Sequence, residues 1–420
     1  MSDQIRASRR SLLAASALAV PSTWLVARPD RPAFAAVRAR GPADEAGTAV
    51  SWHDLTQQVV GAAAFPEPVT QSRTWAVSWL AAARATRADR SPSHGTAALA
   101  QALHDTLAAQ VPTQQAVLDA ALQATLSTVP DGAQKDRGIA DGRAAARRTL
   151  TERAGDGLDT ASVDVAWSPG PPAPGVFELT PPVSRVAIRA GQGAARPFLL
   201  RRNDQFDPGA PYSLTSSRYA ADLAEVRELG AAGSPRTADQ DEVALFWYPA
   251  INFAYVQITR ALLEASPRGS IGSLARLVAA FNVITTDAQI AVYNAKYHYL
   301  FWRPSTAITT GAIDQDPAWT SYQVAPQHPE YPSGHGGQIG SQQGVLEVLV
   351  GRTSPVPITL TSSTAPGVSR TYRDWATISR DVVDARVWEG VHYRTSDVVG
   401  VDIGYRLARW ELGQLYRLGI

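Results

Sequence analysis

The chain carries three short polar stretches close together in its second half: KYHYLFWRP (296–304), PSGH (332–335) and ARVWEGVHYRTSD (385–397). In the first stretch, Lys296 and Arg303 are seven residues apart, which is two turns of an α-helix. We therefore expect both cations to project from the same helix face. Pro304 is expected to end or kink that helix.

The second and third stretches add groups that bind anions. Ser333 is a suitable helix N-cap, and Gly334 lets the backbone approach a ligand closely at the start of the helix that we expect next. Arg386 and His392 are separated by Gly390, which eases a turn out of helical geometry. Three cations, a hydroxyl, free backbone N–H groups and two imidazoles would together surround one tetrahedral oxyanion.

The order of these residues resembles the tripartite signature shared by vanadium-dependent haloperoxidases and type 2 phosphatidic acid phosphatases. The matching motifs are Lys296-x6-Arg303-Pro304, Pro332-Ser333-Gly334-His335 and Arg386-x5-His392. The earlier segments SRYAADLAEVRELG and ADQDEVALFW also resemble bacterial members of the haloperoxidase branch.

The chain departs from the family pattern at two positions. Ala385 stands where the third motif usually has Ser, and Ser396 stands where it usually has Asp, with Asp397 one residue later. A hydrogen bond from position 385 is therefore expected to be missing, and the role of Asp397 beside the site is left open.

The haloperoxidase resemblance implies a vanadate cofactor, whose site phosphate can also occupy. It implies that His392 is the vanadium ligand, and that His335 is the acid–base group that assists binding of hydrogen peroxide. It also implies that five residues bind the vanadate oxygens: Lys296, Arg303, Ser333, Gly334 and Arg386. Lys296 would in addition polarise the bound peroxide, which then oxidises a halide or a small-molecule substrate.

Two other functions are compatible with the same residues. In an exported acid phosphatase, His392 would be the nucleophile that forms a phosphohistidine, and His335 would protonate the leaving alcohol. A non-catalytic anion-binding protein would need only the cations. His328, in HPEYPSGH, looks more like the haloperoxidase side, although a loop histidine bonded to backbone would look the same in sequence. The sequence does not identify the halide or the organic substrate.

Composition and the N-terminus restrict the class of protein. The 39 basic and 38 acidic residues nearly balance, which argues against a nucleic-acid partner, and the absence of cysteine excludes disulfides and thiolate catalysis. Residues 1–35 resemble a twin-arginine export signal: Arg9-Arg10 precede an apolar run and a small-residue site at Ala33-Phe34-Ala35. We expect a periplasmic or secreted protein without a membrane span in the mature chain, and the oligomeric state, including a homo-oligomer, stays open.

Hydrophobic periodicity predicts an all-α fold of helical bundles, with the oxyanion site inside a C-terminal bundle. Residues 36–213 are predicted to form an N-terminal helical region, Ala-rich to about residue 155, followed by a Pro- and Gly-rich stretch over 165–213 that is a long loop or a lining of the pocket mouth. Residues 214–420 form the predicted C-terminal bundle, with a helix starting near Ser217 and interruptions at 304–332 and 355–366. No sustained period-2 alternation bounded by hairpin turns is visible, so the fold is expected to be mostly helical. Three histidines outside the motifs are read as structural or surface residues: His53, His94 and His104.

Overall fold

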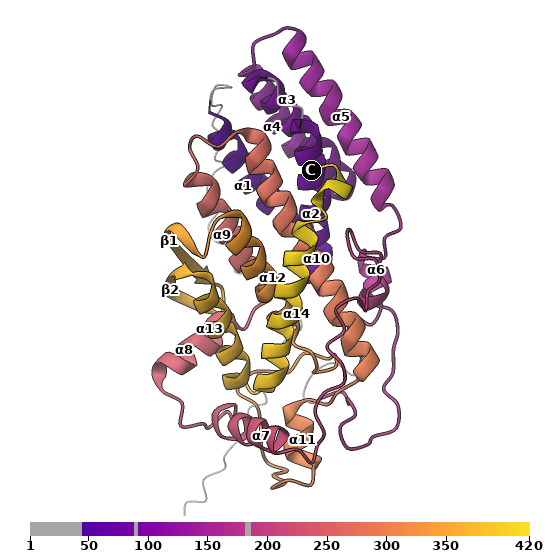
Figure 1. The fold of residues 1–420 in the computed structure, drawn as a ribbon, viewed down its shortest axis with the longest axis vertical. Helices are drawn as coiled ribbons and strands as arrows, with labels where there is room; N and C mark the ends of the chain where they lie inside the picture. The colour runs from indigo at the N-terminus through magenta and orange to yellow at the C-terminus, as the bar shows by residue number, and fades with distance from the viewer. Residues whose placement is uncertain (1–43, 88–90, 181–185) are drawn as a thin grey trace, which may run out of the picture. The chain divides into compact units, whose positions relative to one another are not determined.

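The structure is a computed structural model that describes residues 44–87, 91–180 and 186–420, all within one compact unit. The predicted export signal lies outside the described residues. The described chain contains fourteen α-helices and one two-stranded hairpin, so the predicted all-α class is confirmed (Figure 1). None of the described helices is long and apolar enough to cross a membrane.

The Ala-rich first part forms five helices: α1 (Glu45–Ala63), α2 (Pro68–Thr86), α3 (Pro92–Gln110), α4 (Gln115–Ser127) and α5 (Ala133–Arg153). The N-termini of α2 and α3 each have proline at the first helical position, where a missing N–H costs nothing. Buried aromatic side chains such as Trp52 and Trp79 fill the core between these helices. His53 lies among them and bonds the Thr259 hydroxyl at 2.8 Å, which agrees with a structural role.

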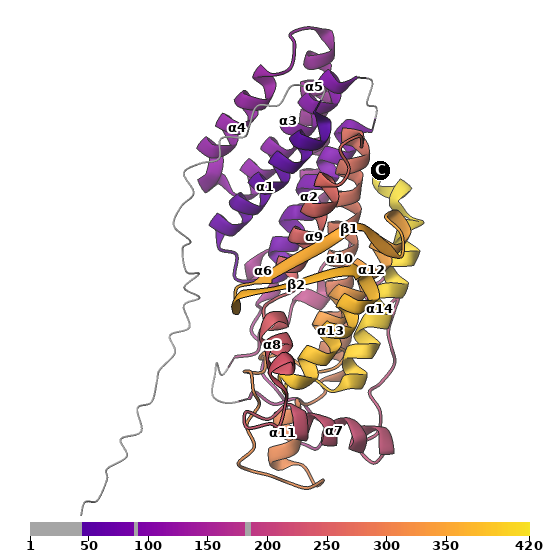
Figure 2. The same cartoon turned by 90° about the vertical axis from the view of Figure 1, so that its left-hand side faces the viewer.

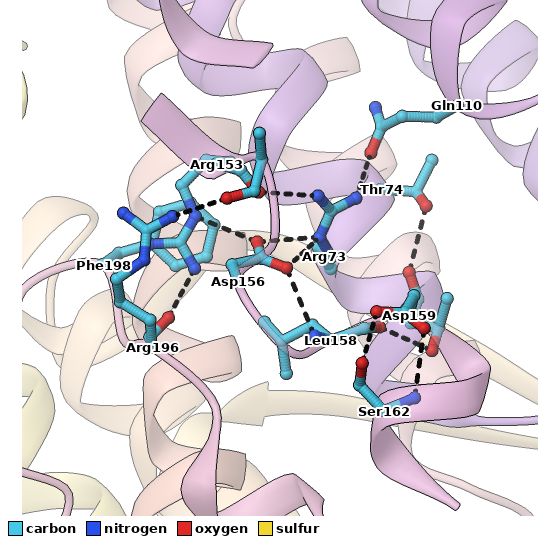
Figure 3. A network of polar contacts seen from close by, with 12 residues as sticks. Arg73, Thr74, Gln110, Arg153, Asp156, Leu158, Asp159, Ser162, Arg196 and Phe198 are labelled. Atoms are coloured by element: carbon cyan, nitrogen blue, oxygen red, sulfur yellow. Dashed lines mark hydrogen bonds and ion pairs between the residues drawn. The ribbon is translucent and has the colours of Figure 1, made fainter. Parts of the chain in front are cut away.

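The segment between α5 and α7 (Ser217–Leu229) is mostly irregular in its described residues, which form α6 (Thr160–Val163) and a 3-10 turn at Gln192–Ala194. Asp156, near its start, accepts from Arg73 Nε at 2.8 Å and Arg153 Nε at 3.1 Å (Figure 3). Further along, the Asp287 carboxylate of α10 accepts the backbone N–H groups of Phe198 and Leu199, each at 2.7 Å. The segment is therefore attached to the helices near its start and again at residues 198–199.

The second half is built on the long helix α10 (Ile271–Tyr299), which contacts both the N-terminal helices and the later bundle (Figure 1). The second half contains six more α-helices, of which α12 and α14 pack directly on α10: α8 (Ala238–Trp247), α9 (Asn252–Glu264), α11 (Pro304–Thr310), α12 (Gly334–Leu349), α13 (Trp375–Trp388) and α14 (Arg394–Leu412). A last 3-10 turn covers Leu415–Leu418. The N-cap of α7 is Ser216, one residue before the predicted Ser217.

The prediction that Lys296 and Arg303 share one helix face is wrong. Helix α10 ends at Tyr299, Leu300 turns the chain with a φ of 51°, and Arg303 is the extended N-cap residue of α11. Pro304 is the cause, because proline disfavours helical geometry in the residue before it and suits the first position of a new helix. The two cations therefore approach the site from different elements.

The chain also contains one hairpin that was not predicted. Residues Thr353–Ser362 (β1) and Ala365–Asp374 (β2) form an antiparallel hairpin that packs against α8, α9 and α13 (Figure 2). Burial alternates along most of β1, where Ile358 and Leu360 are buried and Thr359 is exposed, and three prolines lie within the two strands. A two-stranded hairpin has only edge strands, and edge strands tolerate proline.

Helices α12 and α14 touch along a row of glycines. A Cβ added at Gly404 would lie 2.0 Å from the Gly337 carbonyl oxygen, and one at Gly340 would lie 2.1 Å from that of Val401. Only glycine permits this backbone-to-backbone approach. The row sets how closely the second and third motifs lie, because α12 begins just after Ser333 and α14 just after His392.

We expect Gly404→Ala to lower the free energy of unfolding by about 1–3 kcal/mol, since the added methyl must push the two helices apart. Chemical denaturation measures the change. Gly61→Ala is the matched control, because its Cβ would meet nothing within 4 Å on α1, and it should be neutral or slightly stabilising. Equal stability of the two variants would contradict a tight contact between α12 and α14.

Candidate active site

A small cavity lies where the three motifs meet. Its volume is about 50 Å³, which exceeds the roughly 10–15 Å³ that a single water needs, so a small anion can enter it. The lining residues include Arg189, Gln192, Tyr293, His328, Gly334, His335, Arg386 and His392. Four of these were predicted as site residues, and two come from the 165–213 segment.

His392 is held by a carboxylate that the sequence analysis missed. Its Nδ1 donates to Glu330 Oε1 at 2.8 Å, and the same carboxylate accepts from the Tyr393 N–H at 3.1 Å and from Ser396 Oγ at 2.7 Å. With the proton on Nδ1, Nε2 keeps its lone pair, and its closest partner is Arg303 Nη1 at 3.3 Å. A buried carboxylate behind a histidine is the usual way to fix a metal ligand.

The three predicted cations are all buried at this site, with exposures of 1% or less. Lys296 Nζ donates to the carbonyls of Pro329 and Glu330, both at 2.8 Å, and Arg303 donates to the Val391 carbonyl at 2.8 Å. Lys296 and Arg303 do not themselves line the cavity; they lie behind Gly334 and His392. Arg386, which does line it, is ion-paired with Glu389.

Mutual repulsion among these cations adds to the cost of burying them. Burial and Arg303 together lower the pKa of Lys296 well below its usual value, and burial, with Arg386 also contributing, lowers the pKa of Arg303 to about 10. On the acidic side, burial raises the pKa of Glu330 and of Glu389 to about 7, although neighbouring arginines oppose it. Burial thus disfavours the charged forms of these groups, and a bound anion would stabilise the cations in their protonated forms.

The predicted helix N-terminus is present. Ser333 is the N-cap of α12: its Oγ accepts from the Gly336 N–H at 3.2 Å, and its carbonyl accepts from the Gly337 N–H at 3.0 Å. The N–H groups of Gly334 and His335 have no acceptor among the described residues. Free N–H groups at a helix N-terminus suit an oxyanion.

His335 and His328 both line the cavity. His335 Nε2 donates to the Pro249 carbonyl at 3.0 Å, which leaves Nδ1 unprotonated in the neutral ring. His328 Nδ1 accepts from Arg303 Nη2 at 3.0 Å, so His328 is part of the site and not only bonded to backbone. Burial, followed by nearby cations, lowers the pKa of both imidazoles well below the usual value.

The two departures from the family pattern now have a local description. Ala385 is buried in the core of α13 and offers no side-chain hydrogen bond. Asp397 is fully buried, but the carboxylate that holds His392 comes from Glu330, with Ser396 bonded to it. In the sequence, Glu330 is the acidic residue just before PSGH, in HPEYPSGH. It belongs to none of the three motifs, so the sequence analysis gave it no role.

Replacing Glu330 by glutamine is expected to weaken vanadate binding about 10–100-fold, because the amide cannot accept from His392, Tyr393 and Ser396 together and the imidazole loses its fixed orientation. Calorimetric titration of the apo protein with orthovanadate measures this. Glu228→Gln, an exposed change on α7, is the control. Unchanged affinity in the Glu330 variant would mean that this carboxylate does not position His392.

Comparison with known proteins supports the motif-based resemblance. Residues 276–418 match the family model of the VCPO second helical-bundle domain. The fold is similar to that of a bacterial vanadium-dependent iodoperoxidase, with a TM-score of 0.74 and 19% identity over 87% of this chain and 96% of that one. Bacterial vanadium-dependent chloroperoxidase is also similar: its holo form gives a TM-score of 0.67 and 16% identity over 84% of this chain and 92% of that one. No curated protein sequence matches the chain.

The described fold is thus similar to that of bacterial vanadium haloperoxidases, and it brings the three motifs to one cavity. The predicted resemblance to the vanadium haloperoxidase superfamily is confirmed as a resemblance: residues 276–418 match the family model of the VCPO second helical-bundle domain. At these identities the solved structures establish the fold, and the chemistry has to be argued from this chain's own residues.

Proposed function

We propose that this protein is a vanadium-dependent haloperoxidase, which oxidises a halide with hydrogen peroxide at a vanadate bound by His392. The observation that carries the proposal is the His392–Glu330 pair, which leaves Nε2 as a fixed ligand beside buried cations. When bound, vanadate would supply a Lewis-acid centre that makes peroxide electrophilic towards halide. The predicted export signal would place this activity outside the cytoplasm.

The donor set fits such an oxyanion. Arg386 lines the cavity, Lys296 and Arg303 lie directly behind it, and the free N–H groups of Gly334 and His335 are at the start of α12. Arg386 Nε is buried without a hydrogen-bond acceptor among the described residues. An unpaired buried donor of this kind is costly unless a ligand accepts from it. These groups would hold the vanadate oxygens, with the Ser333 hydroxyl as a further donor.

His335 is positioned to move a proton. Because its Nε2 is committed to the Pro249 carbonyl, Nδ1 is the atom that can take a proton from hydrogen peroxide. Burial, with Arg386 as the next contributor, lowers the pKa of His335 well below its usual value, which keeps this nitrogen unprotonated at neutral pH. Lys296 would contribute positive charge next to the same oxygens, from behind Gly334.

The test is oxidation of bromide and iodide by hydrogen peroxide, measured on purified protein with and without added orthovanadate. We expect activity only after vanadate is added, and we expect millimolar phosphate to slow reconstitution, since the two anions have nearly the same shape. Phosphomonoester hydrolysis is measured on the same samples. Hydrolysis without halide oxidation would replace the peroxidase assignment with the phosphatase one, and binding of vanadate without either activity would indicate an anion-binding protein.

A further inference from the structure

Arg189 lines the cavity together with Arg386, and it comes from a segment outside the three motifs. Its Nη1 donates to the Tyr293 hydroxyl at 2.9 Å, its Nε is ion-paired with Glu67, and its backbone N–H donates to Asp164 at 2.8 Å. Its φ of 63° is unusual for a residue other than glycine, so these contacts hold the backbone in place. The guanidinium is thus fixed without a ligand.

The segment that carries Arg189 is docked closely on α10. At Gly193 an added Cβ would lie 2.5 Å from the Asn294 Cα, so only glycine fits there. Asn294 Nδ2 donates to the Gly193 carbonyl at 3.1 Å, and Gln192 Nε2 donates to the Gln289 carbonyl at 3.1 Å. With the attachments at Asp156 and at Phe198 as well, little ordering remains to oppose ligand binding at Arg189.

The positive charge of Arg189 acts on two imidazoles of the cavity, those of His328 and His335. Arg189 lines the cavity, whereas its partner Glu67 does not. Burial opposes the charge on Arg189, but Tyr293 and Glu67 raise its pKa above the usual value, so it stays protonated. The pKa of His328 and that of His335 are lowered mainly by burial, and Arg189 is among the charges that lower them further.

We propose that Arg189 forms a halide subsite, distinct from the residues that would hold the vanadate oxygens. None of the described residues takes a hydrogen bond from its Nη2, which leaves that group for an anion. Tyr293 connects Arg189 to His328, because its hydroxyl accepts from Arg189 and its ring centroid is 5.1 Å from that of His328. Guanidinium is more weakly hydrated than ammonium, and so it suits a large, weakly hydrated anion such as bromide or iodide. The subsite rests on the proposed peroxidase function.

The experiment compares Arg189→Gln and Arg189→Lys with Arg202→Gln, the same charge change at an exposed side chain on the same segment. For Arg189→Gln we expect the KM for bromide to rise about tenfold or more, with kcat and vanadate affinity changed less than about threefold, and with a weaker dependence of kcat/KM on ionic strength. The Lys variant should recover part of the loss. The Arg202 variant should match the wild type.

Glu67→Gln is a second variant, for which the expected change in the KM for bromide is opposite to that of Arg189→Gln. It removes the anion next to the Nε of Arg189 and should lower the KM for bromide. A second measurement needs no turnover: line broadening of bromide-81 resonance by the vanadate-free protein should fall in Arg189→Gln and rise in Glu67→Gln. The line-width measurement still tests the subsite if the wild type oxidises no halide. That result would overturn the proposed function but not the bromide subsite.

Two results would overturn the subsite. One is bromide KM and line width at wild-type values in both variants. The other is a parallel loss of kcat, vanadate affinity and melting temperature in Arg189→Gln with KM unchanged, which would assign Arg189 a structural role. If the Gln variant does not fold, Glu67→Gln decides the question, because unchanged bromide binding in that protein also contradicts the proposal.

Discussion

Replacement of His392 by alanine is expected to abolish vanadate-dependent halide oxidation. The cofactor would lose its only bond to a protein atom, and the cations alone would hold a weakly bound oxyanion. The loss should exceed the roughly 10–100-fold expected for the outer partner Glu330, since it removes the ligand itself. Orthovanadate titration and bromide oxidation at saturating vanadate measure binding and turnover separately.

His298→Ala is a suitable control for that experiment, because His298 is an exposed imidazole near the end of α10 and does not line the cavity. It should leave both measurements unchanged. Full activity in the His392 variant would remove the assignment of the whole site, including the roles given to the cations.

Replacement of His335 is expected to lower turnover by about a hundred- to ten-thousand-fold while vanadate affinity changes much less. The ring donates to Pro249 through Nε2 and would exchange the proton through Nδ1, so its loss affects proton transfer more than binding. His335→Asn keeps a side-chain N–H for the Pro249 carbonyl and removes the base, and His335→Ala removes both. The two variants should lose similar turnover.

The pH profile provides a second measure of His335. Burial and Arg386 lower its pKa well below the usual histidine value, so the base stays available as the pH falls from 8 to 6.5. Protonation of this group should reduce turnover only at more acidic pH. Strong loss of vanadate affinity with little loss of turnover in His335→Ala would mean that the roles of His335 and His392 have been exchanged.

The sequence correctly predicted that the three motifs meet at one place. It did not correctly predict which helices carry their residues there. Lys296 and Arg303 were expected on one helix, yet they come from the end of α10 and the start of α11. Spacing gives the period of an unbroken helix, and it cannot show where Pro304 starts a new one. Even so, four of the residues proposed to bind the anion or to act on it line one cavity, because their chemistry could be recognised without knowing which element carries them.

The sequence analysis missed side chains whose roles depend on contacts with residues far away in the chain. Glu330 has no motif of its own, and its role becomes visible only when His392, 62 positions away, lies 2.8 Å from it. Arg189 lies 104 positions from Tyr293 in a segment without helical periodicity. The hairpin was missed for a different reason, because its strands contain three prolines, which sequence reasoning takes as a sign against a strand. Long-range contacts of this kind leave no local signature.

The glycine row between α12 and α14 has a mechanical consequence for the two imidazoles. His335 is at the start of α12, and His392 precedes Tyr393, the N-cap of α14. Because the helix backbones touch at Gly340 and Gly404, neither helix can slide or tilt towards the other without atomic overlap. The spacing between proton acceptor and ligand is therefore a property of the scaffold. Exchange of solvent and anions must depend on movement of other segments, such as the chain around Pro249 that His335 holds.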